Sequence, residues 1–423
     1  MAKKKQANKN TTVTPKSDAT RTVQTPCSYF NMISGGLRFS TLVECWGANQ
    51  TGKSTFCYQT VSNFLKEYPD GEFKLLTPEG KVDETRMKYA FGIPLDRIDL
   101  IAAQTLEDGF FEIGERLNTK KPTIILWDTI SAAPTKASFE SQQKATVAPT
   151  DDGADKNKMG MFAGGRTERP RVIKHYLRNL LSMMYEQPVI IMLPNQVFSS
   201  MDMYNPGEQS GEGSALKHDL HYSFHFKTKN SEITYDAKTG LADYTISEVE
   251  LTKSKYCPKF EWKPIYIDNA NGGIIDPLKS IALTAFRLGI IFKVKDPAPG
   301  AGNSNTFAVG EEPPKDTKKE NIDYSKITVL GRDWEKVQSD AVLMAKVERE
   351  IMKRILQKNF IIKMVYMEEY GKADYVKELL AEAEADAAKQ EQESPEPSTD
   401  EVEETDQNAA VGNLIQEAQG PRY

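Results

Sequence analysis

The sequence predicts an α/β fold in which helices cover a mainly parallel β-sheet. From Cys27 to Val294, short apolar runs typical of strands alternate with segments of helical apolar spacing. The clearest predicted strands are "TLVEC" (41–45), "FKLLT" (73–77), "TIILW" (123–127) and "VIIML" (189–193). Helices are expected between these strands at Ser54–Tyr68, Glu84–Phe91, Leu106–Leu117 and Arg171–Tyr185.

Changes in composition divide the 423 residues into segments. Residues 1–24 are polar and predict a disordered basic segment, followed by an α/β core at 25–295. Residues 296–321 hold four Pro and three Gly and predict a linker. Residues 322–380 predict a small helical domain, and 381–423 predict a disordered acidic tail. The helical spacing rests on Val337, Val342, Met344, Val347, Ile351 and Ile355.

Charge and cysteine content narrow the class of protein. Residues 1–26 carry six Lys or Arg and one Asp, a net charge of +5, whereas residues 378–406 carry twelve Asp or Glu and one Lys, a net charge of −11. Four cysteines without a C-x-x-C pair predict reduced thiols. No apolar run approaches membrane-spanning length, and none follows the basic first residues as in a signal peptide. We therefore expect a cytoplasmic protein without a membrane partner.

The stretch "GANQTGKST" fits the phosphate-loop pattern G-x-x-x-x-G-K-[ST] between a predicted strand and a predicted helix. Gly47 and Gly52 allow backbone N–H groups to point inward at phosphate oxygens. Lys53 is expected to reach the β- and γ-phosphates, and the Ser54 hydroxyl to ligate Mg²⁺. The sequence therefore predicts that ATP and Mg²⁺ bind here. The expected nucleotide contacts are Gly47, Ala48, Asn49, Gln50, Thr51, Gly52, Lys53, Ser54 and Thr55.

Polar side chains follow three other predicted strands, where an NTPase needs them. Asp128 ends the strand 123–127 and is expected to bind nucleotide and hold Mg²⁺ together with Ser54. Glu79 follows the strand 73–77, where a carboxylate can accept a proton from the attacking water. Asn195 and Gln196 follow the strand 189–193 and would present amides toward the nucleotide. The alternative for each is an ordinary polar residue at the start of a loop.

Taken in order, these segments resemble the RecA family of strand-exchange recombinases, in particular its bacteriophage members of the UvsX type. The similar stretches run from residue 27 to about residue 294 and include "IILWDTISAAPTK", "MLPNQVF", "SGEGSALK" and "LTKSKY". The ordered set of a strand-end Glu, a strand-end Asp, Asn-Gln, a Gly-rich loop and K-x-K is more specific than the phosphate loop alone. The resemblance implies a RecA-like P-loop NTPase core.

The resemblance also implies roles for single residues. It makes Glu79 the catalytic glutamate, Asp128 the magnesium-side aspartate and Gln196 the sensor of the γ-phosphate. With the lysines described next, the implied catalytic set is Glu79, Lys53, Gln196, Lys253 and Lys255. The family's adenine-stacking tyrosine has no clear match because the segment after Glu79 is one residue longer, and Tyr89 is the candidate.

Lys253 and Lys255 match the family's paired lysines, which reach ATP on a neighbouring subunit. Two lysines two positions apart on a strand project from one face. From that face they could neutralise the charge that develops on the γ-phosphate, as an arginine finger supplied by another protein chain does. A solvated strand face is the alternative.

Two segments with weak strand or helix periodicity match the family's DNA-binding loops, at about 139–169 and 197–213. In the first, Arg166 and Arg169 are candidate phosphate contacts. In the second, aromatic and apolar side chains can stack on bases, and glycine N–H groups can hold phosphates. The candidates there are Phe198, Met203, Tyr204, Gly211 and Gly213.

The implied function is that of an ATP-dependent DNA recombinase, a DNA-dependent ATPase that forms helical filaments on single-stranded DNA. It would catalyse homologous pairing and strand exchange with double-stranded DNA in recombination and repair, in the host cytoplasm if the chain is of phage origin. Single-strand-binding and mediator proteins are further partners that the resemblance allows. Two alternatives remain open: a hexameric RecA-like motor or helicase, and a non-catalytic DNA-organising protein with a vestigial ATP site.

Overall fold

A computed structural model describes most of the chain between residues 21 and 393. The described ranges are 21–78, 82–117, 120–140, 161–185, 187–199, 208–210, 216–298, 304–310, 312–313, 318 and 321–393. Residues up to Leu379 belong to one compact unit, and a second unit begins at Leu380. The disorder expected at 1–24 is wrong for the last residues of that segment, because β1 (Thr22–Val23) pairs with β2 (Leu37–Arg38).

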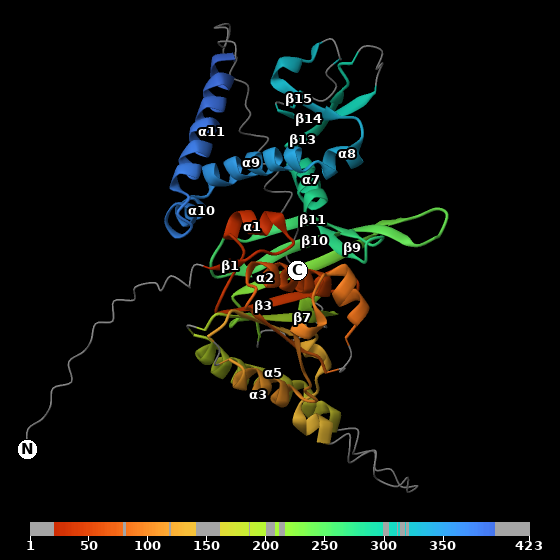
Figure 1. The fold of residues 1–423 in the computed structure, drawn as a ribbon, viewed down its shortest axis with the longest axis vertical. Helices are drawn as coiled ribbons and strands as arrows, with labels where there is room; N and C mark the ends of the chain where they lie inside the picture. Colours follow the sequence, from red (N-terminus) through yellow and green to blue (C-terminus); the bar gives the residue numbers. More distant parts are fainter. Residues whose placement is uncertain are drawn as a thin grey trace, which may run out of the picture. The chain divides into compact units, whose positions relative to one another are not determined.

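A ten-stranded sheet forms the core, in the order β12-β11-β10-β9-β3-β7-β6-β4-β5, with β8 paired to β7 (Figure 1). All pairings from β9 to β5 are parallel, whereas β10, β11 and β12 continue the sheet in antiparallel fashion. The strands are β3 (Thr41–Gly47), β4 (Glu72–Leu76), β5 (Ile98–Ile101), β6 (Thr123–Trp127), β7 (Val189–Ser199), β8 (Glu208–Ser210), β9 (Tyr222–Tyr235), β10 (Ala242–Ser254), β11 (Phe260–Asp268) and β12 (Ile274–Asp276). The predicted α/β class with a mostly parallel central sheet is confirmed.

Helices cover both faces of the parallel strands. On one face, α3 (Leu106–Glu115) and α5 (Met161–Met184) lie side by side (Figure 1). Phe110 of α3 packs against Trp127 of β6 at a ring distance of 5.1 Å. On the other face, Phe56 of α2 (Lys53–Glu67) packs against Phe224 and Phe226 of β9. Each such fully buried side chain contributes about 1.5–3 kcal/mol of transfer free energy. The core therefore holds the strand ends in place from both sides.

Two further helices pack beside the antiparallel strands. In α7 (Pro277–Arg287), the Asp276 carboxylate accepts hydrogen bonds from the N–H groups of Leu278 and Lys279, and proline occupies the first helical position. The short helix α1 (Ser28–Ser34) places Phe30 against Phe224 of β9. Its carbonyl oxygens at Met32 and Ser34 accept hydrogen bonds from the Tyr366 and Tyr370 hydroxyls.

Helix α5 (Met161–Met184) differs from the sequence prediction. α5 begins at Met161, although we expected a helix only from Arg171 and a loop up to Arg169. "GGRTERP" suggests a loop because it holds two glycines and a proline, which disfavour helix. The Arg169 guanidinium donates hydrogen bonds to the carbonyl oxygens of Ile130 and Ala133, so tertiary contacts hold this turn.

The segment after the core also differs from the prediction. The expected linker 296–321 contains β14 (Asn305–Gly310), which pairs with β13 (Ile291–Lys295) and β15 (Ile327–Gly331). The reason is a small apolar cluster in which Phe307 of β14 packs against Trp334 at a ring distance of 4.6 Å. The sequence pattern of such a short strand is hard to detect when prolines and charged residues surround it.

The expected helices follow this three-stranded sheet. They are α8 (Trp334–Ser339), α9 (Ala341–Lys358), α10 (Phe360–Met364) and α11 (Ala373–Glu393). On α9 the predicted apolar face is buried at Met344, Val347 and Ile351, but Val342 is exposed. The disorder expected from residue 381 is wrong up to Glu393, because alanine and glutamate favour helix. Among the described helices, none is both long and apolar enough to cross a membrane.

Short turns complete the described part of the chain. The predicted helix Glu84–Phe91 is largely a π-helical turn, η2 (Arg86–Ala90). The others are η3 (Leu95–Arg97), η4 (Ile130–Ala132), η7 (Tyr324–Lys326) and η8 (Val365–Glu369).

Candidate functional site

The predicted phosphate loop joins the end of β3 to the start of α2. Gly47 has a φ of 155°, and a Cβ there would lie 2.2 Å from the carbonyl oxygen of Phe226. Gly52 has a φ of 92°, and a Cβ there would lie 2.7 Å from Ile267 Cδ1. Only glycine fits both positions. No side chain caps the first turn of α2, so its N–H groups are oriented for an anion at the helix N-terminus.

Lys53 is the first residue of α2 and is half-buried at the loop. Its Nζ donates a 2.5 Å hydrogen bond to the carbonyl oxygen of Ala48, at the opposite side of the loop. Burial lowers the pKa of Lys53, and the neighbouring Asp128 opposes that shift. A cation whose desolvation is only partly compensated gains from an added anion, so the loop suits a phosphate chain.

Asp128 lies directly after β6, where the carboxyl ends of β4, β6 and β7 meet. Its N–H donates to the carbonyl oxygen of Leu76 in β4 at 2.9 Å, and Thr129 Oγ1 donates to the carbonyl oxygen of Pro194 in β7 at 3.0 Å. Tyr58 Oη of α2 donates to Asp128 Oδ2 at 3.1 Å. Burial and the Asp128 charge raise the pKa of Tyr58, so its hydroxyl keeps its proton and orients the carboxylate.

The residues expected at Mg²⁺ fit that ion. Ser54 supplies a hydroxyl in the first turn of α2, and Asp128 supplies a carboxylate whose geometry is set by Tyr58. In NTPases, Mg²⁺ is commonly held by one or two protein oxygens together with substrate phosphates. Among the described residues, no cluster of three or more His, Cys, Asp or Glu is suited to a metal.

The strand of the predicted sensor, β7, and the strand that precedes the predicted base, β4, lie on either side of β6 and its following residue Asp128 in the strand order. Gln196 is exposed on β7 and is the direct parallel-register partner of Gly47, so the amide side chain starts beside the phosphate loop. Glu79 lies outside the described residues. The described range before Glu79 ends at Pro78. Two residues earlier, Leu76 of β4 pairs with Trp127 of β6. The last described residues before Glu79 therefore lie at the same end of the sheet as Asp128.

A cavity of about 450 Å³ opens beside the phosphate loop. Arg86 lines it, donating from Nη2 to Thr55 Oγ1 at 3.0 Å and from Nε to the carbonyl oxygen of Gly272 at 3.2 Å. Tyr235, Thr245 and Asn269 line its other side. Sequence reasoning missed these residues, although a basic residue shortly after the strand-end Glu79 was an available signal.

Tyr89, the candidate adenine-stacking residue, does not lie in this cavity. Its side chain is 75% exposed, with the ammonium of Lys88 over its ring. A role for Tyr89 in base stacking within one protomer therefore has no support from its position.

The two predicted trans-acting lysines lie at the other end of the strands. Lys253 pairs with Ser223 of β9, whereas the phosphate-loop residue Gly47 pairs with Phe226 of the same strand. That difference of three residues corresponds to about 10 Å along the sheet. Lys253 Nζ donates to the carbonyl oxygens of Lys217 and His218, and Lys255 is exposed.

The predicted DNA-binding residues are only partly described. Arg166 and Arg169 are in α5, where the Arg169 side chain anchors the turn after Asp128. Phe198 is in β7, opposite Gln209 of β8. The expected second loop is therefore wrong at its base, where β7 and β8 form a hairpin. Met203, Tyr204, Gly211 and Gly213 lie outside the described residues.

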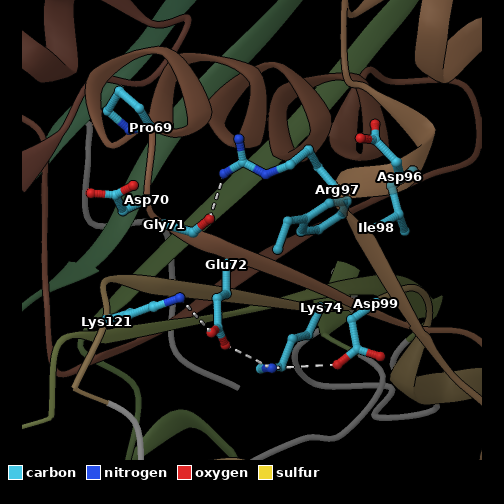
Figure 2. Close-up of a pocket in the computed structure, with 11 residues that line it drawn as sticks. Pro69, Asp70, Gly71, Glu72, Lys74, Asp96, Arg97, Ile98, Asp99 and Lys121 are labelled. Carbon is cyan, nitrogen blue, oxygen red and sulfur yellow. Dashed lines mark hydrogen bonds and ion pairs between the residues drawn. The ribbon is translucent and has the colours of Figure 1, made fainter.

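A second cavity, of about 580 Å³, lies at the opposite, amino ends of β4 and β5 (Figure 2). In this cavity, Lys74 Nζ lies between the carboxylates of Glu72 and Asp99, at N···O distances of 3.0 Å and 3.3 Å (Figure 2). Arg97 donates to the carbonyl oxygen of Gly71 at 2.6 Å. Nucleotides bind at the carboxyl ends of parallel strands, so this cavity is not a candidate for ATP.

Comparisons with known proteins find relatives at low sequence identity. No family model matches the chain. The chain is 25% identical over 223 residues to Protein RecA of Mycoplasma pneumoniae, which covers 52% of this chain and 59% of that protein. It is 25% identical over 263 residues to the plasmid Protein RecA of Lactococcus lactis, and 24% identical over 285 residues to Protein RecA of Mycoplasma genitalium. These matches cover 62% and 66% of this chain, and 68% and 74% of the relatives.

The similarity thus spans about three fifths of the length of the Mycoplasma pneumoniae protein. The matches therefore show a similarity to proteins named RecA at 24–25% identity.

Proposed function

We propose that this chain is an ATP-dependent DNA recombinase, of the phage UvsX type, that forms filaments on single-stranded DNA. One observation carries the proposal: a single strand, β7, links the nucleotide end of the sheet to the predicted DNA-binding hairpin. Gln196 pairs with Gly47 of the phosphate loop, and the strand continues to Ser199, where it pairs with β8. A shift at the sensor therefore moves the base of the hairpin.

Each residue then has a defined task. Lys53 and the α2 N–H groups bind the β- and γ-phosphates, and Ser54 and Asp128 hold the ion that screens their charge. Bound Mg²⁺ supplies that charge neutralisation and orients the phosphates. Glu79 accepts a proton from the attacking water, and Gln196 detects whether a γ-phosphate is present.

Assembly completes the site. Lys253 lies about 10 Å along the sheet from the level of Gly47. In the proposed filament, Lys253 and Lys255 act on the nucleotide of the next protomer. Nucleotide at that interface joins two protomers and favours the filament that binds single-stranded DNA and pairs it with a duplex. Hydrolysis removes the bridging γ-phosphate, weakens the interface and releases DNA.

The test combines turnover with imaging. Purified protein is mixed with ATP, Mg²⁺ and single-stranded DNA, phosphate release is followed, and the same mixture is examined by negative-stain electron microscopy. We expect DNA-stimulated hydrolysis and open helical filaments, followed by strand exchange with a homologous duplex. Closed rings would indicate a hexameric motor instead, and no turnover at saturating DNA would indicate a non-catalytic DNA-organising protein.

A further inference from the structure

A buried carboxylate lies between the phosphate loop and the predicted DNA-binding hairpin. Glu44 is in the middle of β3, three residues before Gly47, and its side chain is fully buried. Isolated buried carboxylates are costly and are uncommon in strands that otherwise carry apolar residues. The surroundings of Glu44 show how the charge is accommodated.

Three donors from three different strands converge on Glu44. Oε1 accepts from Asn195 Nδ2 of β7 at 3.0 Å and from the Ser210 hydroxyl of β8, and Oε2 accepts from the Ser223 hydroxyl of β9 at 2.9 Å. Asn195 and Ser210 are also bonded to each other at 3.0 Å. Because all three groups donate, the ionised carboxylate is the acceptor that satisfies them together. Burial raises the pKa of Glu44, and these hydrogen bonds oppose that shift.

Each of the three donors leads to a functional segment. The side-chain oxygen of Asn195 accepts from the N–H of Gln196 at 2.9 Å, so it holds the backbone of the predicted sensor. Ser223 Oγ accepts from Trp46 Nε1 at 3.1 Å, and Trp46 directly precedes Gly47. Ser210 is the last residue of β8, the return strand of the hairpin.

β8 depends on this contact for its position. It is three residues long, and in the described part of the chain its strand pairing is with β7 alone, from Glu208 to Ser210. The Ser210 hydroxyl adds a charge-assisted hydrogen bond to the central strand β3. The hairpin is therefore fastened to the strand that leads into the phosphate loop.

We propose that Glu44 is a positioning residue that couples the phosphate loop and the Gln196 sensor to the DNA-binding hairpin through Ser210. The inference rests on the proposed function, in which the hairpin binds DNA. When nucleotide shifts Gln196 or Gly47, the shared carboxylate carries the shift to β8, and DNA held at the hairpin acts back on the sensor by the same route.

The decisive variant is Ser210→Ala in the full-length chain, because it removes the hairpin's hydrogen bond and leaves Glu44 with two donors. Ser247→Ala is the matched control, since Ser247 is a fully buried serine of β10 in the same sheet whose hydroxyl is bonded to Thr228 and not to Glu44. We expect Ser210→Ala to raise the DNA concentration for half-maximal ATPase stimulation at least about 10-fold. Hydrolysis without DNA should stay within about twofold of wild type in both variants. Glu44→Gln should behave like Ser210→Ala if it folds.

Hydrogen exchange provides a readout that does not need DNA. Binding of a non-hydrolysable ATP analogue should slow exchange of the β7–β8 amides in wild type and in Ser247→Ala, but not in Ser210→Ala. Unchanged stimulation and unchanged protection in Ser210→Ala would overturn the inference. Equal losses in both serine variants would also overturn it, because a general loss of stability would then explain them. If wild type lacks DNA stimulation, the proposed function fails, and the exchange comparison alone decides the role of Glu44.

Discussion

The two halves of the central sheet are buried in different ways. In the parallel half, every residue of β3 and β6 is buried, because helices cover both faces. In the antiparallel half, buried residues alternate with partly exposed ones along β10, as in a sheet with one covered face. The parallel half therefore provides a rigid support for the phosphate loop and Asp128. The antiparallel half leaves one face partly exposed, with Lys253 and Lys255 at its end, where the proposed function places the neighbouring copy.

The largest expected effect comes from the parallel half. Lys53→Ala should reduce ATP hydrolysis by at least about 1,000-fold, because charge on the transferred γ-phosphate loses its nearest cation. The measurement is phosphate release at saturating single-stranded DNA. Lys74→Ala is the control: Lys74 is in the same half but bonded to Glu72 and Asp99 at the opposite end of β4, so its loss should leave turnover nearly unchanged. Wild-type turnover in Lys53→Ala would exclude the phosphate-loop assignment.

The antiparallel half is tested by the double variant Lys253→Ala/Lys255→Ala. DNA-stimulated hydrolysis should fall about 100- to 1,000-fold, whereas ATP binding by the isolated protomer should hardly change. Lys238→Ala, in the exposed turn between β9 and β10, is the control.

Mixing separates action in trans from action within one chain. Protein with the double lysine change, mixed with Lys53→Ala protein, should recover part of the activity at mixed interfaces. If no mixing ratio restores turnover, the two halves do not serve neighbouring copies in the way proposed.

A smaller effect is expected from Glu79, which follows β4 of the parallel half. Glu79→Gln should keep ATP binding but slow hydrolysis about 100-fold, because the amide cannot accept the proton of the attacking water. Filaments on DNA should consequently persist longer. Glu84→Gln changes an exposed carboxylate five residues further on and should leave the rate intact. An equal rate in Glu79→Gln and wild type would remove Glu79 from the chemistry.

The smallest effect is expected where the halves meet. His221 Nδ1 accepts from the N–H of Leu42 in β3 at 3.1 Å, and burial, followed by the charges of Lys255 and Lys253, lowers the pKa of His221 to about 4. Between about pH 6.5 and pH 4 the unfolded chain binds a proton that the folded chain does not, so stability falls as the pH is lowered.

His221→Gln retains a hydrogen-bond acceptor but does not titrate. On going from about pH 7 to pH 5, wild type should lose about 1 kcal/mol more stability than this variant, since partial exposure screens the effect. Urea unfolding at the two pH values provides the comparison. Identical losses in the two proteins would show that folding does not shift the pKa of His221.

The sequence predicted the parallel half well and the antiparallel half poorly. Strands such as Thr123–Trp127 are continuous apolar runs with a polar residue at the end, which is the pattern of a buried parallel strand. Strands β9 to β11 alternate weakly and contain many charges, so only the K-x-K pair marked them. The sequence analysis missed β14 because Pro, Gly and charged residues surround its short alternating pattern, although it pairs with its neighbours in sequence, β13 and β15.

The candidate site likewise contains residues that could be located from the sequence and residues that could not. Glycines, Lys53 and Asp128 could be located because local backbone geometry and charge require those residue types at a given spacing. Arg86, Tyr58 and Glu44 could not, since their roles come from hydrogen bonds to Thr55, Asp128 and Ser210. Arg169 shows the reverse case: we selected it for its charge, but its guanidinium holds backbone carbonyl groups of η4.

The tyrosine contacts to α1 have a consequence for synthesis of the chain. Tyr366 and Tyr370 bond to Met32 and Ser34, which the ribosome produces 334 and 336 residues earlier. The carbonyl groups at the end of the first helix cannot acquire these partners until nearly the whole chain has been translated. At about 5–20 residues per second, that delay is roughly 17 to 67 seconds. During translation, the first helix and the growing sheet must therefore persist without this contact, and its closure marks a late event in folding.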